Sequence, residues 1–329
     1  MKNILTTLAL VILVGCQEKQ IERTFLTPEV VSDSIYTSMP GEMVICDEFL
    51  VWEDPFTRDN HLHIVDLNNG KEIGQMGKKG QGPKEFTTPM LSHIVKDRCL
   101  RVEDANTSRR ALFSIDSLLQ GKDYYIELPK AEGFKGAELE ENMYFRNAPD
   151  SIPYYFELTV NDNTVYFGNY PIENERFHVG GNIAYDPVKG HLVYATWDFP
   201  YMALYQKEKN SFKLLHERKK KPEYHVADGK LFLENREKVG AFSVILLKDY
   251  IVTLERDYQT DNTNEMTVGR DFTKCPQTIF LYDYELNLKK IVNLRMPIVR
   301  ITGSATNNMV YAMVVNPEFT LVKCDVGEL

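Results

Sequence analysis

One pattern occurs twice in the sequence, as Leu50-Val51-Trp52-Glu53-Asp54 and, at an offset of 50 residues, as Leu100-Arg101-Val102-Glu103-Asp104. The correspondence continues downstream, where Val65-Asp66 matches Ile115-Asp116. A repeat period of roughly 20–50 residues is typical of propellers, solenoids and other arrays. The sequence therefore predicts a chain built from repeated units.

The same order of turns and strands recurs along the whole chain. A pair of turn residues precedes a strand-like run at 49–52, 99–102, 164–167, 191–197, 250–254 and 309–314. A second run returns at 63–65, 112–115, 203–205, 279–282 and 319–322. Turn residues before β-branched and aromatic runs indicate β-hairpins. Helical periodicity is almost absent, so the sequence predicts an all-β fold.

The number of units predicts a six-bladed β-propeller. Six units over roughly 300 residues leave about 50 residues each, slightly more than the 40–45 of a four-stranded blade. We expect a single domain over residues 28–329 with four antiparallel strands in each blade, because radial closure removes long exposed sheet edges. Seven blades is the alternative, since 143–145 and 230–233 are further strand-like segments that follow turn residues.

The ring is expected to close through the beginning of this domain. Residues 309–314 and 319–324 supply strands of the last blade, which then lacks an outer strand. Val30 and Val31 lie in a strand-like segment before the first unit. Because closure removes an open edge, we predict that residues 29–32 pair with the final blade.

The composition is ordinary for a globular protein and limits the classes of partner. The 329 residues are 43% hydrophobic, and Lys+Arg 38 against Asp+Glu 47 give a formal net charge of −9. A nucleic-acid-binding protein needs clustered cationic surface to displace phosphate counterions. We therefore expect no nucleic-acid partner, and we expect a monomer.

The N-terminus has the pattern of an export signal. Met1-Lys2-Asn3 is cationic, and residues 4–14 form an apolar run that is shorter than the roughly 20 residues of a membrane-spanning helix. We interpret residues 1–15 as a signal peptide. It ends in Leu13-Val14-Gly15-Cys16, which resembles the lipobox of bacterial lipoproteins.

This resemblance implies that Cys16 is lipidated and becomes the mature N-terminus, with residues 16–27 as a tether. Gln17 is not the aspartate that marks inner-membrane retention in enteric bacteria, so the resemblance favours an anchor in the outer membrane, facing the periplasm or the outside. The alternative is an ordinary secretory signal that happens to contain a cysteine.

Residues 77–86, with the sequence GKKGQGPKEF, carry the pattern Gly-x-x-Gly-x-Gly-Pro-x-x-Phe between the first two units. The segment resembles the inter-blade connection of NHL-type propellers, and the whole chain resembles the TolB-like six-bladed propeller lipoproteins of bacterial envelopes. The resemblance implies architecture and location but no reaction. We expect Phe86 to plug between sheets. Lys84 departs from the family pattern at a position that glycine often occupies.

The sequence lacks the familiar nucleophile, phosphate-loop and zinc-protease motifs. His61 and His63 are two residues apart and could hold a metal on one strand face, but we expect His61 to end a loop and His63 to pair across the sheet. We therefore favour a protein that is not an enzyme.

Four cysteines follow Cys16 without metal-binding spacing. They are Cys46, Cys99, Cys275 and Cys324. An oxidising compartment would allow two disulfides. We favour buried thiols, because most of these cysteines lie within apolar strand-like runs.

The acidic pairs of the repeat are the candidate ligand-binding residues. Glu53-Asp54 and Glu103-Asp104 end the same strand in successive units, and radial repetition places equivalent positions on one face. A cluster of these carboxylates could bind calcium or a cationic or hydroxyl-rich ligand, although we expect no obligatory cofactor. The alternative is that strand-terminal acids cap turns through backbone N–H groups.

Two further segments are candidates for partner contacts. Residues 218–221 are a basic run that could contact an anionic envelope polymer or simply be solvated. Residues 257–275 are a polar insertion in the fifth unit, of a kind that often extends over a binding face but is equally typical of a disordered loop.

The sequence thus favours a cell-envelope lipoprotein that binds a protein or glycan partner as a non-catalytic or scaffold module. The alternative is a polysaccharide hydrolase or lyase in which Glu53 and Glu103 act across the central opening.

Overall fold

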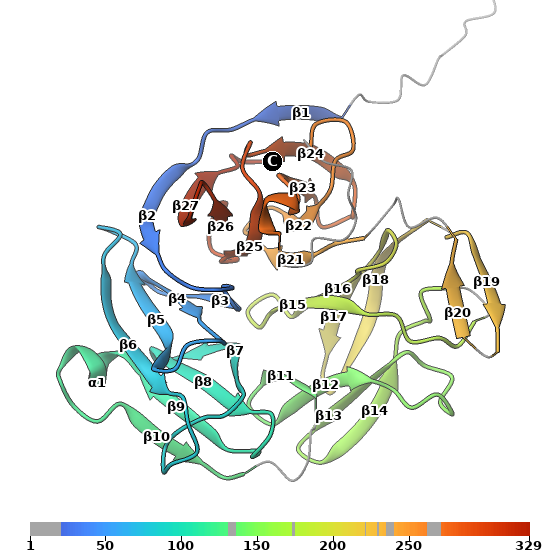
Figure 1. Ribbon diagram of the computed structural model, residues 1–329. Coiled ribbons are helices and arrows are strands. Elements are labelled where there is room, and N and C mark those ends of the chain that lie inside the picture. Colours follow the sequence, from blue (N-terminus) through green and yellow to red (C-terminus); the bar gives the residue numbers. More distant parts are fainter. Residues whose placement is uncertain are drawn as a thin grey trace, which may run out of the picture.

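Six small sheets are arranged in a ring around one axis (Figure 1). The computed structural model describes residues 21–130, 136–172, 175–220, 222–228, 230–234, 240–261 and 271–329. The predicted signal peptide 1–15 and Cys16 lie outside the described residues. The predicted six-bladed β-propeller with four-stranded antiparallel blades is confirmed, and the seven-bladed alternative is wrong.

The first three blades follow one another along the chain, each from its innermost to its outermost strand. Blade 1 contains β3 (Met43–Cys46), β4 (Phe49–Glu53), β5 (Asn60–Asp66) and β6 (Glu72–Lys78). Blade 2 contains β7 (Pro89–Lys96), β8 (Cys99–Asp104), β9 (Arg110–Ser114) and β10 (Tyr125–Leu128), with the short helix α1 (Ile115–Leu119) before β10. Blade 3 contains β11 (Ala137–Glu140), β12 (Met143–Asn147), β13 (Phe156–Val160) and β14 (Asn163–Phe167).

The last three blades include additions at their outer edges and in their loops. Blade 4 contains β15 (Gly181–Asp186), β16 (His191–Thr196), β17 (Tyr201–Glu208) and β18 (Ser211–Lys219), followed by a separate hairpin of β19 (Tyr224–Ala227) and β20 (Lys230–Leu233). Blade 5 contains β21 (Ser243–Leu246), β22 (Ile251–Glu255), β23 (Thr278–Tyr282), β24 (Leu288–Asn293) and, outermost, β1 (Glu22–Phe25), with the 3-10 turn η1 (Phe272–Lys274) before β23. Blade 6 contains β25 (Ile298–Gly303), β26 (Met309–Val315), β27 (Phe319–Asp325) and, outermost, β2 (Glu29–Ile35).

Both segments that suggested a seventh blade have other roles. Residues 143–145 belong to β12, the second strand of blade 3, and 230–233 form β20 in the hairpin outside the ring. The run 164–167, predicted to occupy the position of β4 and β8, is instead the outermost strand β14. In blade 3 the turn 141–142 joins the first two strands and the turn 161–162 joins the last two. Both are two-residue hairpin turns that contain residues with positive φ. The sequence alone therefore does not distinguish the first turn of a blade from the last.

The ring closes as predicted. β2 pairs antiparallel with β27, in a register that joins Glu29 to Lys323 and Ile35 to Phe319. The predicted tether 16–27 is too long at its C-terminal end, because residues 22–25 form β1 and pair in parallel with β24. The pairing satisfies backbone groups on the outer edge of blade 5 that would otherwise face solvent.

The antiparallel order gives the disc two different faces. On one, the turn face, many connections are two-residue turns: 47–48, 97–98, 141–142, 161–162 and 209–210. On the other, the loop face, lie the connections between second and third strands and those between blades, up to the long loop 256–277. Binding residues are concentrated in loops held by a rigid scaffold, so the loop face is where a site is expected.

The core lies between neighbouring blades. In the cluster between blades 1 and 2, Leu62, Ile64, Leu100 and Val102 are fully buried, and Phe86 joins them from the connecting segment, as predicted. Within the described part of the chain, no helix is long and apolar enough to cross a membrane.

Candidate functional site on the loop face

Four exposed aromatic side chains lie in connections of the loop face. They come from connections in four different blades and are between 47% and 84% exposed: Tyr36, Phe56, Tyr154 and Trp197. On the described part of the turn face, the large exposed apolar side chains of the connections are Val188 and Leu119. Aromatic side chains provide large rigid contact area, so their distribution distinguishes the two faces as binding surfaces.

Trp197 is held in its exposed position by two glycines. Its backbone N–H donates to Gly180 O at 3.0 Å, and its carbonyl accepts from Gly240 N at 2.7 Å. A Cβ atom at Gly180 would lie 2.3 Å from Cε3 of the indole ring. The ring therefore lies directly over glycine backbone, and half of its surface still faces solvent.

Asp54 and Asp104 have the capping role that was the alternative to ligand binding. Asp104 is almost fully buried, and although burial opposes its ionisation, backbone N–H groups that include those of Thr107 and Thr88 lower the pKa of this carboxyl to about 2. Asp54 accepts from the Phe56 N–H at 3.1 Å. Both carboxylates therefore hold the loops that follow them.

Glu53 is in a different chemical state. Its side chain is buried, and burial together with the neighbouring Glu42 raises the pKa of this carboxyl to about 7. One hydrogen bond comes from the backbone N–H of Leu91 in the neighbouring blade. Among the described residues, Oε1 of Glu53 has no hydrogen-bond partner. Glu53 is thus a buried carboxyl group with a pKa near neutral pH, at the loop-face end of blade 1.

Glu103 lies in another environment, between blades 2 and 3. Burial and then the charge of Glu138 raise the pKa of Glu103. Glu138 itself accepts from Arg101 at 2.8 Å and from Arg110 at 3.3 Å. This mixed-charge network joins the two blades, so Glu103 is part of an inter-blade contact.

The four predicted carboxylates therefore have separate surroundings. Two cap loops, Glu53 faces blade 2, and Glu103 faces blade 3. Over the ranges that the structure describes, no group of three or more His, Cys, Asp or Glu side chains is arranged to hold a metal ion.

The two histidines are structural. His61 is fully buried, burial lowers its pKa to about 4, and its Nδ1 donates to the carbonyl of Gly77. His63 stacks on Trp52 with ring centroids 4.0 Å apart and contacts Glu72 at 2.8 Å. His63 thus pairs across the sheet as expected, and His61, the second residue of β5 after the loop 54–59, lies in the core.

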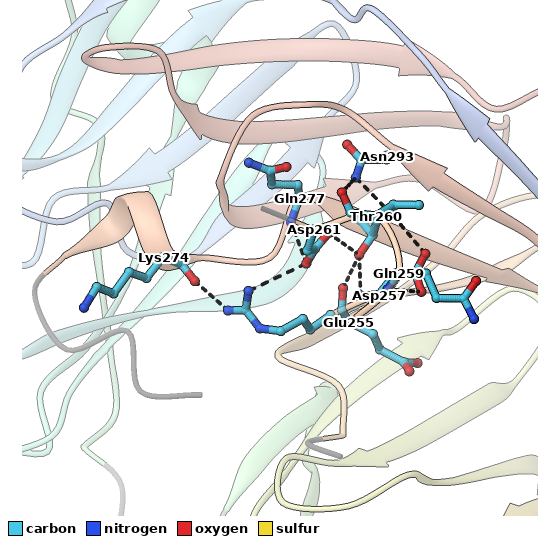
Figure 2. Close-up of polar contacts among 10 residues, drawn as sticks. Glu255, Asp257, Gln259, Thr260, Asp261, Lys274, Gln277 and Asn293 are labelled. Atoms are coloured by element: carbon cyan, nitrogen blue, oxygen red, sulfur yellow. Dashed lines mark hydrogen bonds and ion pairs between the residues drawn. The ribbon is translucent and has the colours of Figure 1, made fainter. Parts of the chain in front are cut away.

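A buried polar network holds the base of the long loop in blade 5 (Figure 2). The side chains of Arg256 and Asp261 are fully buried, with Nη1 and Oδ2 3.7 Å apart. Arg256 also donates to the Lys274 carbonyl at 2.5 Å, and Asp261 accepts from Gln277 N at 3.3 Å and Thr278 Oγ1 at 3.2 Å. The described ends of the predicted insertion 257–275 are therefore ordered around one ion pair, while 262–270 lies outside the described residues.

The same network reaches the neighbouring blade. Burial raises the pKa of the Cys275 thiol to about 11, and the nearby guanidinium groups of Arg300 and Arg256 oppose the shift. Arg300 of β25 in turn lies 3.8 Å from Glu42, next to Glu53. We name this series of groups from blades 5, 6 and 1 the polar arc: Asp261, Arg256, Arg300, Glu42 and Glu53.

Sequence reasoning identified Glu53 but missed the other members of the polar arc. Arg256 directly precedes the polar insertion 257–275, and Asp261 lies within it. The insertion was the signal in the sequence that could have led to these two residues. Arg300 lies within β25 and Glu42 directly precedes β3, and neither stands in a distinctive motif, so no local signal could have found them. Of the basic run, residues 218–220 are exposed, and Lys221 lies outside the described residues.

The glycine-rich segment 77–86 connects blades 1 and 2 as the resemblance implied. A Cβ at Gly77 would lie 2.2 Å from Cε1 of His61, and the Gly82 N–H donates to Glu85 at 2.8 Å. Lys84 has φ of 61°, a left-handed backbone conformation that glycine adopts without steric strain.

The four cysteines in the part of the chain that the structure describes are free thiols. Three are buried as expected, namely Cys46, Cys275 and Cys324, and Cys99 is half-buried.

The propeller resembles solved structures of bacterial proteins. An exported protein from Bacteroides fragilis matches with a TM-score of 0.55 at 10% identity, over 93% of this chain and 99% of that chain. A member of the DUF4221 family from Bacteroides vulgatus matches with a TM-score of 0.54 at 10% identity, over 91% of this chain and 94% of that chain. No protein-family model and no curated protein matches the sequence. Likeness at this identity establishes the fold alone.

Proposed function

We propose that this protein is a lipid-anchored lipoprotein of the bacterial outer membrane that binds a protein or glycan partner on its loop face without catalysis. The observation that carries the proposal is the presence of four exposed aromatic side chains in the connections of that face, with the Trp197 ring packed over glycine backbone. Aromatic side chains dominate the energetics of protein interfaces and stack well on apolar ring faces.

The proposed cellular location rests on the sequence. The lipobox-like segment that ends at Cys16 supports a lipid anchor, and the similarly folded protein of Bacteroides fragilis is described as exported. An envelope location gives the partner its chemical class, because the surrounding molecules are membrane proteins and polysaccharides.

Two substitutions test the binding face. Trp197→Ala and Phe56→Ala should each weaken capture of the partner from solubilised envelopes or on a glycan array, since both remove exposed aromatic area from the loop face. Tyr166→Ala is the matched control, because Tyr166 is an exposed aromatic on the outer strand β14. Equal capture by all three variants and the wild type would place the binding surface elsewhere.

A polysaccharide hydrolase or lyase is the second candidate, and one observation favours it. Glu53 has a pKa of about 7 and an oxygen without a hydrogen-bond partner among the described residues, which is the state of a general acid. Turnover of a glycan panel that is lost in Glu53→Gln would establish this function. Turnover that survives the change would remove Glu53 from it.

A further inference from the structure

The chain enters the propeller at its rim. β1 and β2 follow the outer perimeter of blades 5 and 6 (Figure 1), because they are the outermost strands of those sheets. The first described strand begins at Glu22, which pairs with Lys290 of β24. We refer to the outer surface of β1 and β2 as the entry rim.

The entry rim carries exposed apolar side chains. Phe25 is 52% exposed at the end of β1, and Val30 is 53% exposed on β2. The guanidinium of Arg295 lies over the Phe25 ring, 4.8 Å from its centroid. An aromatic ring beside an arginine is a combination suited to the boundary between lipid and water.

The charges of the entry rim are largely neutralised. Arg23 pairs with Asp257 at 3.3 Å, Lys290 with Glu22 at 3.4 Å and Lys323 with Glu29 at 3.1 Å. The rim therefore offers no strong attraction to an anionic surface. Any contact with lipid would depend on its apolar side chains.

The distance from Cys16 limits where a membrane can lie. Six residue steps separate Cys16 from Glu22, and an extended chain covers about 20 Å in that number of steps. A lipid anchor on Cys16 thus keeps the entry rim close to the bilayer. The far side of the ring, where β10 is the outermost strand of blade 2, has no such restraint.

We propose that the entry rim is a lipid-contacting surface, and that the propeller stands edge-on to the membrane with Phe25 and Val30 at the interface. This inference rests on the lipid anchor of the proposed function. In this orientation neither face is covered by lipid, so the loop face stays open to a partner at the side.

Fluorophore labels on an outer strand of the entry rim and on an outer strand two blades away test the orientation. Val30→Cys and Ile126→Cys place labels on exposed β-branched positions, 53% and 49% exposed, on β2 and β10. Both are made in the full lipidated chain with the half-buried Cys99 replaced by serine. The chain is bound to zwitterionic vesicles that carry a nitroxide quencher on the lipid head group.

The label at position 30 should lose more fluorescence than the label at position 126, and the difference should persist in high salt. Equal or reversed quenching on vesicles that carry the protein would overturn the edge-on orientation while leaving the anchor intact. Failure of the chain to float with vesicles would instead overturn the anchor and the rim contact together.

A second variant separates rim contact from tethering. Phe25→Asp should reduce quenching at position 30 without changing flotation, because a charged side chain at the interface disfavours contact with lipid. Unchanged quenching in this variant would show that the short tether alone keeps the rim near the bilayer, and the apolar contact would be wrong.

Discussion

Arg256 and Asp261 form an ion pair with both side chains fully buried, their nearest atoms 3.7 Å apart. The pair fixes the first turn of the longest loop on the loop face, and hydrogen bonds to Lys274 and Gln277 fix the return of that loop to β23. Arg23 of β1 joins the same region through Asp257. The loop and the closing N-terminal segment are therefore stabilised by one group of charges.

Asp261→Ala should destabilise the protein by about 3–5 kcal/mol, because removal of one partner leaves a buried charge without compensation. Thermal or urea unfolding measures the effect. Glu208→Ala is the control, since Glu208 makes an exposed ion pair with Lys213, and little change is expected there. A small effect of Asp261→Ala would show that Arg256 has other adequate partners.

Glu53→Gln should alter the dependence of stability on pH. The pKa of Glu53 is raised from 4.5 to about 7 in the folded state, so folding favours the protonated carboxyl. Its contribution to the free energy of unfolding is complete below pH 4.5 and is lost as the pH rises through 7. The shift corresponds to a change of about 3 kcal/mol in the free energy of unfolding. The variant should match the wild type at pH 4 and be more stable at pH 8. Parallel stability curves across this range would contradict the assignment.

Lys84→Gly should stabilise the fold, because glycine adopts the left-handed backbone at this position without steric strain. The change also removes the exposed ion pair with Asp123 and the contact with Tyr125. Lys84→Ala removes the same contacts but keeps the strain, so it should be less stable than Lys84→Gly. The urea midpoints of the two variants provide the measurement.

Gly77→Ala should destabilise the junction of blades 1 and 2 by about 1–3 kcal/mol or more, since a methyl group would overlap His61 and φ is 73°. Gly121→Ala is a matched control with φ of 66° and no atom within 4 Å of the new Cβ. The difference between the two midpoints isolates the contact with His61. Equal losses would show that backbone strain alone is responsible.

Deletion of residues 28–32 should lower the melting temperature and promote aggregation. The deletion removes the β2 pairing near Lys323 and Val322, at a cost of about 0.5–1.5 kcal/mol for each lost hydrogen bond. It also exposes the edge of β27. An unchanged melting temperature in a soluble variant would mean that the ring closes by another route.

The amino-acid sequence by itself determined the class and closure of the fold. Pairs of turn residues followed by alternating runs identify hairpins from neighbouring residues alone. The 50-residue offset between Glu53 and Glu103 reveals the repeat. The missing outer strand of the last blade was sufficient to place residues 29–32. Local signals were insufficient in blade 3, where Asn142 and Asp162 mark similar turns at opposite edges of one sheet.

Only the tertiary structure decided what the acidic groups do. Glu53 and Glu103 occupy equivalent positions in the repeat, yet Glu53 accepts from the Leu91 backbone, whereas Glu103 lies near Glu138, which pairs with two arginines. The polar arc joins Arg300 and Glu42 from different blades. Sequence spacing reports the strand face on which a side chain lies, whereas its pKa and partners depend on the neighbouring blade, which is distant in the chain.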